Sequence, residues 1–262
     1  MSGTGQRAHL MHELRASFGM LTVFPVATSP RRRWSVLGLA PVVGLVLGGA
    51  AAGLVMLAGL AFTGPSGALL VAVLTIAGLA LLTRGLHLDG LADTADGLGP
   101  LGSAQTRLAV MRRPDVGAFG VATLTLVLLT DCAALARDIT AGRGAAAILV
   151  AVATGRLVMT QAGVPGIPPA HADGLGAQVA QSVPRPLAWG LTALVLLATT
   201  SCLALAPAAL VIRLDLAVLA GCLAAAMLRR HLVRRLGGIT GDVLGALCEV
   251  ATCVCLVVTA LG

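Results

Sequence analysis

Residues 66–97 read SGALLVAVLTIAGLALLTRGLHLDGLADTADG. The first part of this stretch, 66–83, is apolar and uncharged, and a helix needs about 20 apolar residues to cross a bilayer. The chain has further candidate membrane spans of the same kind at 35–62, 116–136, 144–163, 187–206, 208–228 and 243–261. We therefore predict an all-α polytopic membrane bundle of about seven transmembrane helices, folded as a single integral membrane domain over residues 1–262.

The apolar interval 187–228 allows a second interpretation. Only Arg213 and Asp215 interrupt it near the boundary between two expected spans. One long hairpin or a re-entrant segment is therefore the alternative to two separate helices.

The composition excludes a soluble domain. Hydrophobic residues make up 57% of the chain and charged residues 11%, with a mean hydropathy of +0.95, whereas soluble domains carry about 25% charged residues. The net charge of +7 does not indicate nucleic-acid binding, because aromatic residues are only 2% and base-stacking platforms need them. The basic residues are all Arg and lie between apolar runs, which is typical of cytoplasmic loops in a membrane protein.

Arginine is concentrated in loops that share one side of the membrane. With the N-terminus on the cytoplasmic side, the inside loops are 84–115, 164–186 and 229–242. The outside loops are short, and only the 137–143 loop opposes the bias of Arg toward the inside. The polar segments of the chain therefore collect on the cytoplasmic face.

The N-terminal segment, residues 1–34, is expected to stay in the cytoplasm. Within it, the stretch 10–27 is amphipathic and too short to span a bilayer. We predict that this stretch is an interfacial helix on the membrane surface.

Three acidic residues fall within eight positions, namely Asp89, Asp93 and Asp96. On a helix, the spacing i, i+4, i+7 places them on one face, and carboxylates so close together repel one another unless a cation lies between them. Hard carboxylate oxygens suit Mg²⁺ or Mn²⁺, which bridges phosphate oxygens in turn. The alternative is a solvated helix start, where Asp favours the positive end of the helix dipole. We predict that these residues are catalytic and hold metal, within an active-site segment over 84–115.

A second acidic pair follows a glycine-rich turn near the C-terminus. Residues 237–249 read GGITGDVLGALCE, and the seven-residue spacing of Asp242 and Glu249 places both on one helix face. A Gly-rich turn that enters a helix is a common anion cradle, so Gly241 is a candidate substrate-binding residue. The alternatives are a capping role for Asp242 and a protonated structural acid at Glu249. We predict that both acids belong to the catalytic site.

The other candidate substrate-binding residues carry a positive charge or a ring nitrogen. They are Arg84, His87, Arg112, Arg156 and His171. Arg156 lies inside an apolar span and requires a buried carboxylate or a phosphate, whereas Arg112 would clamp a phosphate from a loop. The alternatives are a positive-inside anchor at Arg112, an interfacial histidine at His87 and an ordinary loop residue at His171.

At these motifs the chain resembles the cobalamin synthase family, the adenosylcobinamide-GDP ribazoletransferases. Residues 85–97 match the family's G-L-H-L-D-G-L-A-D-T-A-D-G, and residues 237–249 match its G-G-I-T-G-D-x-L-G-A-x-x-E. Supporting similarity extends the resemblance over nearly the whole chain, at residues 18–25, 41–44, 112–120 and 170–176. The chain departs from the family pattern at Val23, Asp115 and His171.

The resemblance implies a reaction and its partners. A ribose hydroxyl of α-ribazole, or of its 5′-phosphate, attacks the cobinamide-linked phosphate of adenosylcobinamide-GDP, and GMP leaves. Magnesium is the expected cofactor. The protein is expected in the plasma membrane of a bacterium, with several passes through the lipid bilayer and the active site facing the cytoplasm. The Ala- and Gly-rich spans also permit a homo-oligomer.

The resemblance also suggests roles for the candidate residues. We expect Asp89, Asp93 and Asp96 to hold metal on the diphosphate. Either Asp242 or Glu249 would complete the metal shell or accept the hydroxyl proton. Phosphate contacts are expected from Arg112, Arg156 and His171.

Two other classes stand as alternatives. The CDP-alcohol phosphotransferases also place acids on membrane helices and release a nucleoside monophosphate. However, Asp93 stands where their motif has Arg, and their distal G-x(3)-D-x(3)-D is missing. An ion-coupled transporter would place charge at the membrane midplane in broken helices, whereas these acids gather at one interface.

Overall fold

The computed structural model describes residues 3–24, 33–201 and 206–261 of the chain. Within these residues the structure is helical, and an isolated β-bridge joins Pro169 to Ile239. In chain order the helices are α1 (Gly3–Leu21), α2 (Arg33–Gly38), α3 (Ala40–Ala61), α4 (Gly64–Leu82), α5 (Leu86–Leu98), α6 (Ala104–Met111), α7 (Ala118–Thr140), α8 (Gly144–Ala162), α9 (Gly174–Val179), α10 (Arg185–Ser201), α11 (Ala208–Leu236) and α12 (Gly241–Ala260).

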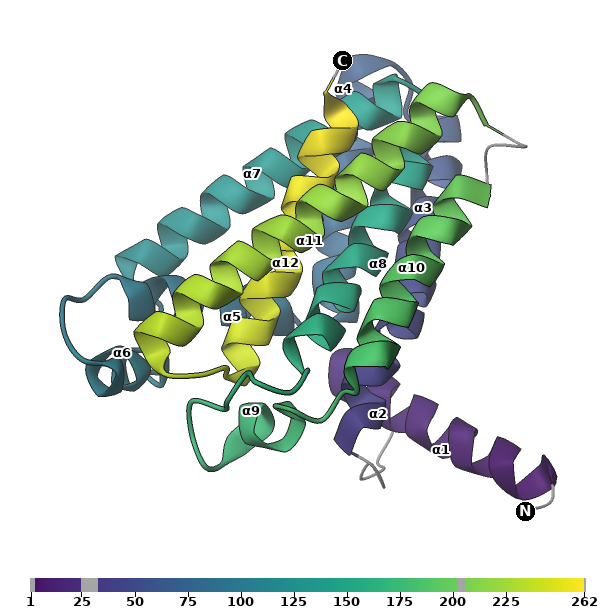
Figure 1. Ribbon diagram of the computed structural model, residues 1–262. Helices are drawn as coiled ribbons and strands as arrows, with labels where there is room; N and C mark the ends of the chain where they lie inside the picture. The colour runs from purple at the N-terminus through teal and green to yellow at the C-terminus, as the bar shows by residue number, and fades with distance from the viewer. Residues whose placement is uncertain (1–2, 25–32, 202–205, 262) are drawn as a thin grey trace.

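Among the described residues, six helices are long and apolar enough to cross a membrane: α3, α4, α7, α8, α11 and α12. The predicted all-α polytopic membrane bundle is therefore confirmed, with six such helices where about seven were expected. The expected span 187–206 corresponds to α10, whose 17 described residues end at Ser201, while residues 202–205 lie outside the described part. Helix α10 packs beside α11 along the bundle (Figure 1).

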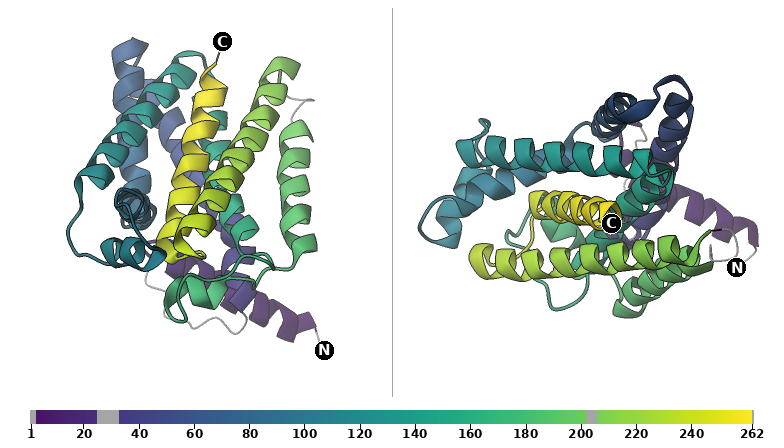
Figure 2. Two further views of the ribbon diagram at one scale, coloured as in Figure 1. Left: turned by 60° about the vertical axis from the view of Figure 1, so that its left-hand side comes forward. Right: turned by 90° about the horizontal axis from the view of Figure 1, so that it is seen from above.

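Helices α8 and α12 form the centre of the bundle. Of the 18-residue apolar segment in each spanning helix, 78% is buried in α8 and 67% in α12, against 22–33% in the other four. Seen from above, α12 lies between α7 and α11 (Figure 2). The outer helices expose apolar side chains, as expected for surfaces that face lipid tails.

Glycines allow the central helices to approach closely. A Cβ on Gly48 of α3 would lie 2.9 Å from the Leu149 carbonyl oxygen of α8. A Cβ on Gly155 of α8 would lie 2.9 Å from the Cys248 carbonyl oxygen of α12. Both approaches are too close for any larger side chain, so glycine is needed where these backbones touch.

The expected span 35–62 is divided in the structure. Helix α2 ends at Gly38 and α3 begins at Ala40, one residue before Pro41. Proline has no amide donor and fits the first turn of a helix, so a new helix starts at this point.

The predicted loop 229–242 is wrong for most of its length. Helix α11 continues to Leu236 and ends at Gly237, which adopts a left-handed conformation with φ of 82°. The arginines of this segment therefore lie on the last turns of a helix, where positive charge complements the helix dipole. Likewise, the expected segment 84–115 contains two helices, α5 and α6.

The N-terminal segment forms a helix, as predicted, and α1 leaves the bundle at the end where α6 and α9 lie (Figure 1). It starts at Gly3, earlier than the predicted stretch 10–27, of which residues 25–27 lie outside the described part. Ala16 and Leu21 are buried while Met11 is exposed, which fits a helix lying on a surface.

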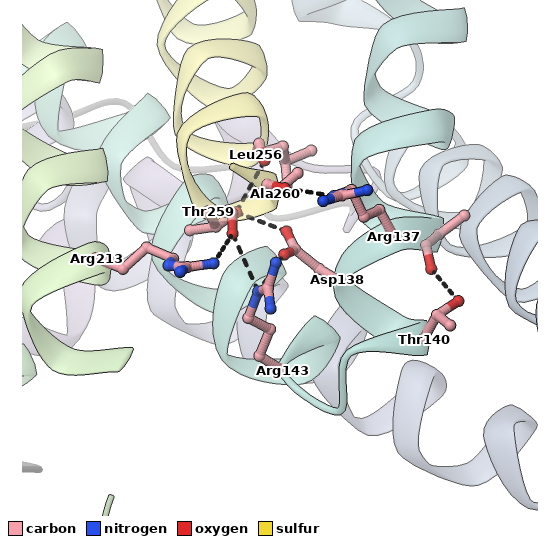
Figure 3. Close-up of polar contacts among 9 residues, drawn as sticks. Arg137, Asp138, Thr140, Arg143, Arg213, Leu256, Thr259 and Ala260 are labelled. Atoms are coloured by element: carbon pink, nitrogen blue, oxygen red, sulfur yellow. Dashed lines mark hydrogen bonds and ion pairs between the residues drawn. The ribbon is translucent and has the colours of Figure 1, made fainter. Parts of the chain in front are cut away.

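At the opposite end of the bundle, three arginines cap the C-terminus of α12 (Figure 3). Arg137 Nε donates to the Ala260 carbonyl at 2.6 Å. Arg143 Nε and Arg213 Nη1 donate to the Thr259 carbonyl at 3.0 and 3.3 Å. The last carbonyls of a helix have no partner within it, so these contacts satisfy them. This capping gives a structural reason for the loop that opposes the charge bias.

Candidate functional site

The site is built where α5 crosses the N-terminal end of α12. A Cβ on Gly90 would lie 2.7 Å from the Asp242 carbonyl oxygen and 2.8 Å from its Cα atom. One turn further along α12, a Cβ on Gly245 would lie 3.0 Å from the His87 carbonyl oxygen. The two backbones are therefore in contact. The crossing places Asp242 beside the helix that carries Asp89 and Asp93, although the two segments are far apart in sequence.

Helix α5 starts abruptly because the chain turns sharply after α4. Arg84 and Gly85 both have left-handed backbones, with φ of 55° and 66°. Such a conformation is rare for a residue with a side chain, and this strain at Arg84 lies directly before the acidic helix.

The three aspartates of α5 share one face but differ in exposure. Asp89 is exposed, Asp93 is half-buried and Asp96 is buried. Burial, followed by the negative charges of Asp89, Asp242 and Asp96, raises the pKa of Asp93 to about 6. None of the arginines or histidines that the structure describes forms an ion pair with these acids. Within this cluster the negative charges of Asp89, Asp242 and Asp96 act on Asp93, while the charge of His171 acts favourably on Asp242.

Asp96 anchors a neighbouring helix. Its Oδ2 accepts the Gly117 amide at 2.7 Å, and its Oδ1 accepts the Gly120 amide at 2.9 Å. These amides belong to the N-terminus of α7, where a carboxylate also complements the helix dipole. Asp96 therefore fixes α7 against α5, a contact that the sequence analysis missed.

A second group of polar residues lies behind α5, inside the bundle. Arg156 of α8 is 3% exposed, and its Nη2 lies 3.4 Å from His87 Nδ1. Arg156 and Glu249, together with Asp131 of α7, line a cavity of only about 30 Å³. This is room for about one water molecule. The structure therefore separates Arg156, His87 and Glu249 from the open cavities. Asp131, which was not among the site residues expected from the sequence, joins them.

This buried group does not suit a metal ion. His87, Cys248 and Glu249 are the one set of three such side chains, among the described residues, whose ligand atoms lie within 4.8 Å of one another. However, the Arg156 guanidinium lies against His87, and its charge repels a cation. Because Arg156 can only donate, His87 Nδ1 must accept, and the Nε2 atom then carries the proton in the neutral ring.

Two adjoining cavities open on the α12 side of α5, and we call them the α12-side cavities. They have volumes of about 400 and 480 Å³ and share Leu108, Arg112 and His171. Gly241 and Asp242 line the first of them, together with Asp173. The fold thus gathers Arg112, His171, Gly241 and Asp242 around one space, as the sequence analysis expected of site residues.

A third cavity, which we call the α7-side cavity, lies on the other flank of α5. Its volume is about 570 Å³. Arg84 and Asp89 line it, and its other residues are Gly85, Leu86, Ala92, Val116 and Leu124. The carboxylate cluster therefore has an open cavity on each side.

These features define a class. A helical membrane protein that gathers four carboxylates at a helix crossing, beside open cavities, has the features of a membrane enzyme. The chain belongs to the cobalamin-5-phosphate synthase family, whose model matches residues 13–260. It is accordingly a membrane enzyme of cobalamin biosynthesis that transfers phosphate-containing groups.

Curated relatives support this assignment along the whole chain. The adenosylcobinamide-GDP ribazoletransferase of Frankia casuarinae is 40% identical, over 96% of this chain and 95% of its own. The enzyme of the same name from Bradyrhizobium diazoefficiens is 34% identical, over 98% and 96%. That of Stutzerimonas stutzeri is 39% identical, over 90% and 91%. No solved structure matches the chain.

Replacing Gly90 with alanine is expected to lower activity at least about tenfold by pushing α5 away from α12, because small misplacements of reacting groups are costly. Overpacking should also lower the free energy of unfolding by about 1–3 kcal/mol. The matched control is Gly49→Ala on α3, where an added Cβ meets nothing within 4 Å. Turnover and thermal unfolding of both variants in detergent check this, and wild-type turnover in Gly90→Ala would contradict a tight crossing.

Proposed function

We propose that the protein transfers the cobinamide phosphate of adenosylcobinamide-GDP to α-ribazole or to its 5′-phosphate, with Mg²⁺ as cofactor and GMP as leaving group. The observation that carries the proposal is the meeting of Asp89 and Asp93 of α5 with Asp242 of α12. Family membership supplies the substrates, because the relatives bear the name of this reaction.

The residues fit a magnesium ion. Their donors are hard carboxylate oxygens, and no arginine or histidine among the described residues forms an ion pair with them. A cation between them would relieve their mutual repulsion. No three of them bring their oxygens within 4.8 Å of one another in the described part of the chain. Mg²⁺ commonly takes one or two carboxylates directly and completes its shell with water and substrate phosphates, so the three acids can hold it through direct and water-mediated contacts. Bound there, Mg²⁺ would neutralise charge on the diphosphate.

We assign Asp89, Asp93 and Asp242 to metal binding, and Asp96 to positioning them through α7. Of the two acids that the sequence offers to complete the metal shell, Asp242 lines an open cavity, whereas Glu249 lines only the 30 Å³ one. Arg112 and His171 lie where they can contact substrate phosphate. In the reaction, the acceptor oxygen bonds to phosphorus, the bond to the GMP oxygen breaks, and the hydroxyl proton passes to a carboxylate of the cluster.

We also propose that the site faces the cytoplasm. The end of the bundle with α6 and α9 carries most of the arginines, whereas Arg137, Arg143 and Arg213 at the other end bond to carbonyls of α12. The loop bias therefore favours the cytoplasm for the site. The structure contains one chain, and a homo-oligomer stays a prediction.

The test is turnover by purified protein in detergent with Mg²⁺, adenosylcobinamide-GDP and α-ribazole. Equal amounts of GMP and a new corrinoid product are expected. Release of CMP from a CDP-alcohol instead would support the CDP-alcohol phosphotransferases. Failure to form GMP with either acceptor, in protein shown to be folded, would contradict the proposal.

Magnesium is expected to raise the thermal unfolding midpoint more at about pH 7.5 than at about pH 5.5. The pKa of Asp93 is raised from 3.8 to about 6, so between these values the folded state holds more protons than the unfolded state. The stability of the metal-free protein therefore falls as pH rises through this interval. Protons compete with the cation at the lower pH. Thermal unfolding in MgCl₂ or in EDTA at each pH measures the shift in the midpoint. Asp93→Asn should reduce the dependence of the midpoint on Mg²⁺ and its dependence on pH. A midpoint that ignores Mg²⁺ at both pH values would count against the site.

A further inference from the structure

The carboxylate cluster lies between the α7-side cavity and the α12-side cavities, whose linings carry different charged and polar side chains. Asp89 lines the α7-side cavity, while Asp242 lines the α12-side cavities. Asp93 lies close enough to both for their charges to act on it. A phosphorus atom held at the cluster would therefore be reachable from both flanks of α5.

Transfer between two substrates requires such an arrangement. In phosphoryl transfer, the attacking and leaving oxygens lie roughly in line on opposite sides of phosphorus. The acceptor and the leaving nucleotide must then occupy different spaces. Each cavity has about 400 to 570 Å³, which suits a nucleoside or nucleotide, whereas a corrinoid ring system must remain outside.

The α12-side cavities combine apolar side chains with several charged and polar ones. Arg112 and His171 line both of them, Asp173 lines one, and Gln105 lines the other. The first also contains the N-terminal end of α12 at Gly241, where backbone amides and the helix dipole favour phosphate. A guanine edge needs hydrogen-bond donors and acceptors, and its diphosphate needs positive charge, so this lining suits a guanosine diphosphate.

The α7-side cavity is mostly apolar. Its wall includes Leu86, Val116 and Leu124, and its only cationic side chain is Arg84. The base of α-ribazole is a benzimidazole, and this ring would bury its apolar faces against such a wall. A 5′-phosphate on the same nucleoside would pair with Arg84.

On the basis of the proposed function, we infer that the α7-side cavity binds the benzimidazole nucleoside acceptor and the α12-side cavities bind the guanosine diphosphate of the donor. Attack then comes from the α7 side: the acceptor oxygen bonds to phosphorus, the phosphorus–oxygen bond to GMP breaks toward the α12 side, and the hydroxyl proton passes to a carboxylate of the cluster. Arg84 is the residue that favours a phosphorylated acceptor.

A matched pair of cavity-filling variants tests this partition. Val116 and Ala109 are both exposed, and they line the α7-side cavity and one α12-side cavity respectively. Val116→Phe should raise the KM for α-ribazole about tenfold and leave the KM for adenosylcobinamide-GDP within about twofold; Ala109→Phe should do the reverse. The opposite split, equal changes in both KM values, or no change in either would overturn the assignment.

Arg84→Ala provides a second readout that needs no turnover. Calorimetric titration of the folded protein with α-ribazole 5′-phosphate should show about tenfold weaker binding than wild type, while α-ribazole binds within about twofold. Equal effects on both ligands would overturn the role of Arg84. Wild-type protein that releases GMP while these variants give the wrong split would refute the partition and leave the proposed function standing.

Discussion

Asp93→Asn should reduce GMP release at least about 1,000-fold while leaving the protein folded. Asp93 is the acid that the charges of Asp89, Asp96 and Asp242 all act on, so it lies at the centre of the cluster. Asparagine keeps the size of the side chain and removes the negative charge that the cation requires. The same change relieves repulsion, so the thermal midpoint without metal should not fall. Initial rates at saturating substrates and unfolding in EDTA measure the two effects.

The matched control is Asp115→Asn. Asp115 is exposed in the connection between α6 and α7 and lines none of the three open cavities. Its replacement by asparagine makes the same change in charge. Its turnover should stay within about twofold of wild type, as for most surface substitutions. If Asp93→Asn kept its turnover, or if both variants lost it equally, the cluster could not be the metal site.

The shared helix face of the three aspartates was predictable because helical periodicity acts over short distances. The spacing of Asp89, Asp93 and Asp96 requires one face on any helix, and the structure has a helix over Leu86–Leu98. The contact with Asp242 depends on glycines at the crossing, which the sequence shows only as a local pattern. The role of Asp96 at α7 was not predictable. Its partners are backbone amides, which every residue except proline has, so the sequence does not show which amides it contacts.

The depth of a residue within the bundle was not predictable from hydropathy. Helix α8 has the lowest mean hydropathy of the six spanning helices, 1.5, yet the largest buried share. Lipid is itself apolar, so hydropathy does not separate a lipid-facing helix from a central one: α12 is central, yet its mean hydropathy of 2.2 equals that of the outer helices α3 and α4. Arg156 was rightly recognised as unusual, but its place behind α5 depends on which helix is central. The predicted end of the span 208–228 was wrong for a related reason. Arginine is a good helix former, and α11 continues past the apolar residues to Leu236.

Asp138→Ala should lower the free energy of unfolding by about 3 kcal/mol, at the end of the bundle away from the active site. Asp138 is fully buried, and its carboxylate accepts from Arg143 Nε at 2.7 Å and from the Thr259 hydroxyl at 2.6 Å (Figure 3). Removing it leaves the arginine and the hydroxyl without their acceptor where water is scarce. Unfolding in detergent, followed by heat or denaturant, measures the loss.

The effect should be confined to stability. Helix α12 has 20 residues, or about 30 Å, between this end and Asp242. Turnover per folded molecule should therefore match wild type. As a control, Thr130→Ala, an exposed change on the same α7, should shift the free energy of unfolding by less than about 0.5 kcal/mol.

In the double variant Asp138→Ala/Arg143→Leu, the second change should lower the free energy of unfolding less than Arg143→Leu does alone, because it removes a charge that is already unpaired. Strict additivity would show that the ion pair contributes nothing. Reduced turnover in folded Asp138→Ala would show instead that the capped end of α12 controls the position of Asp242.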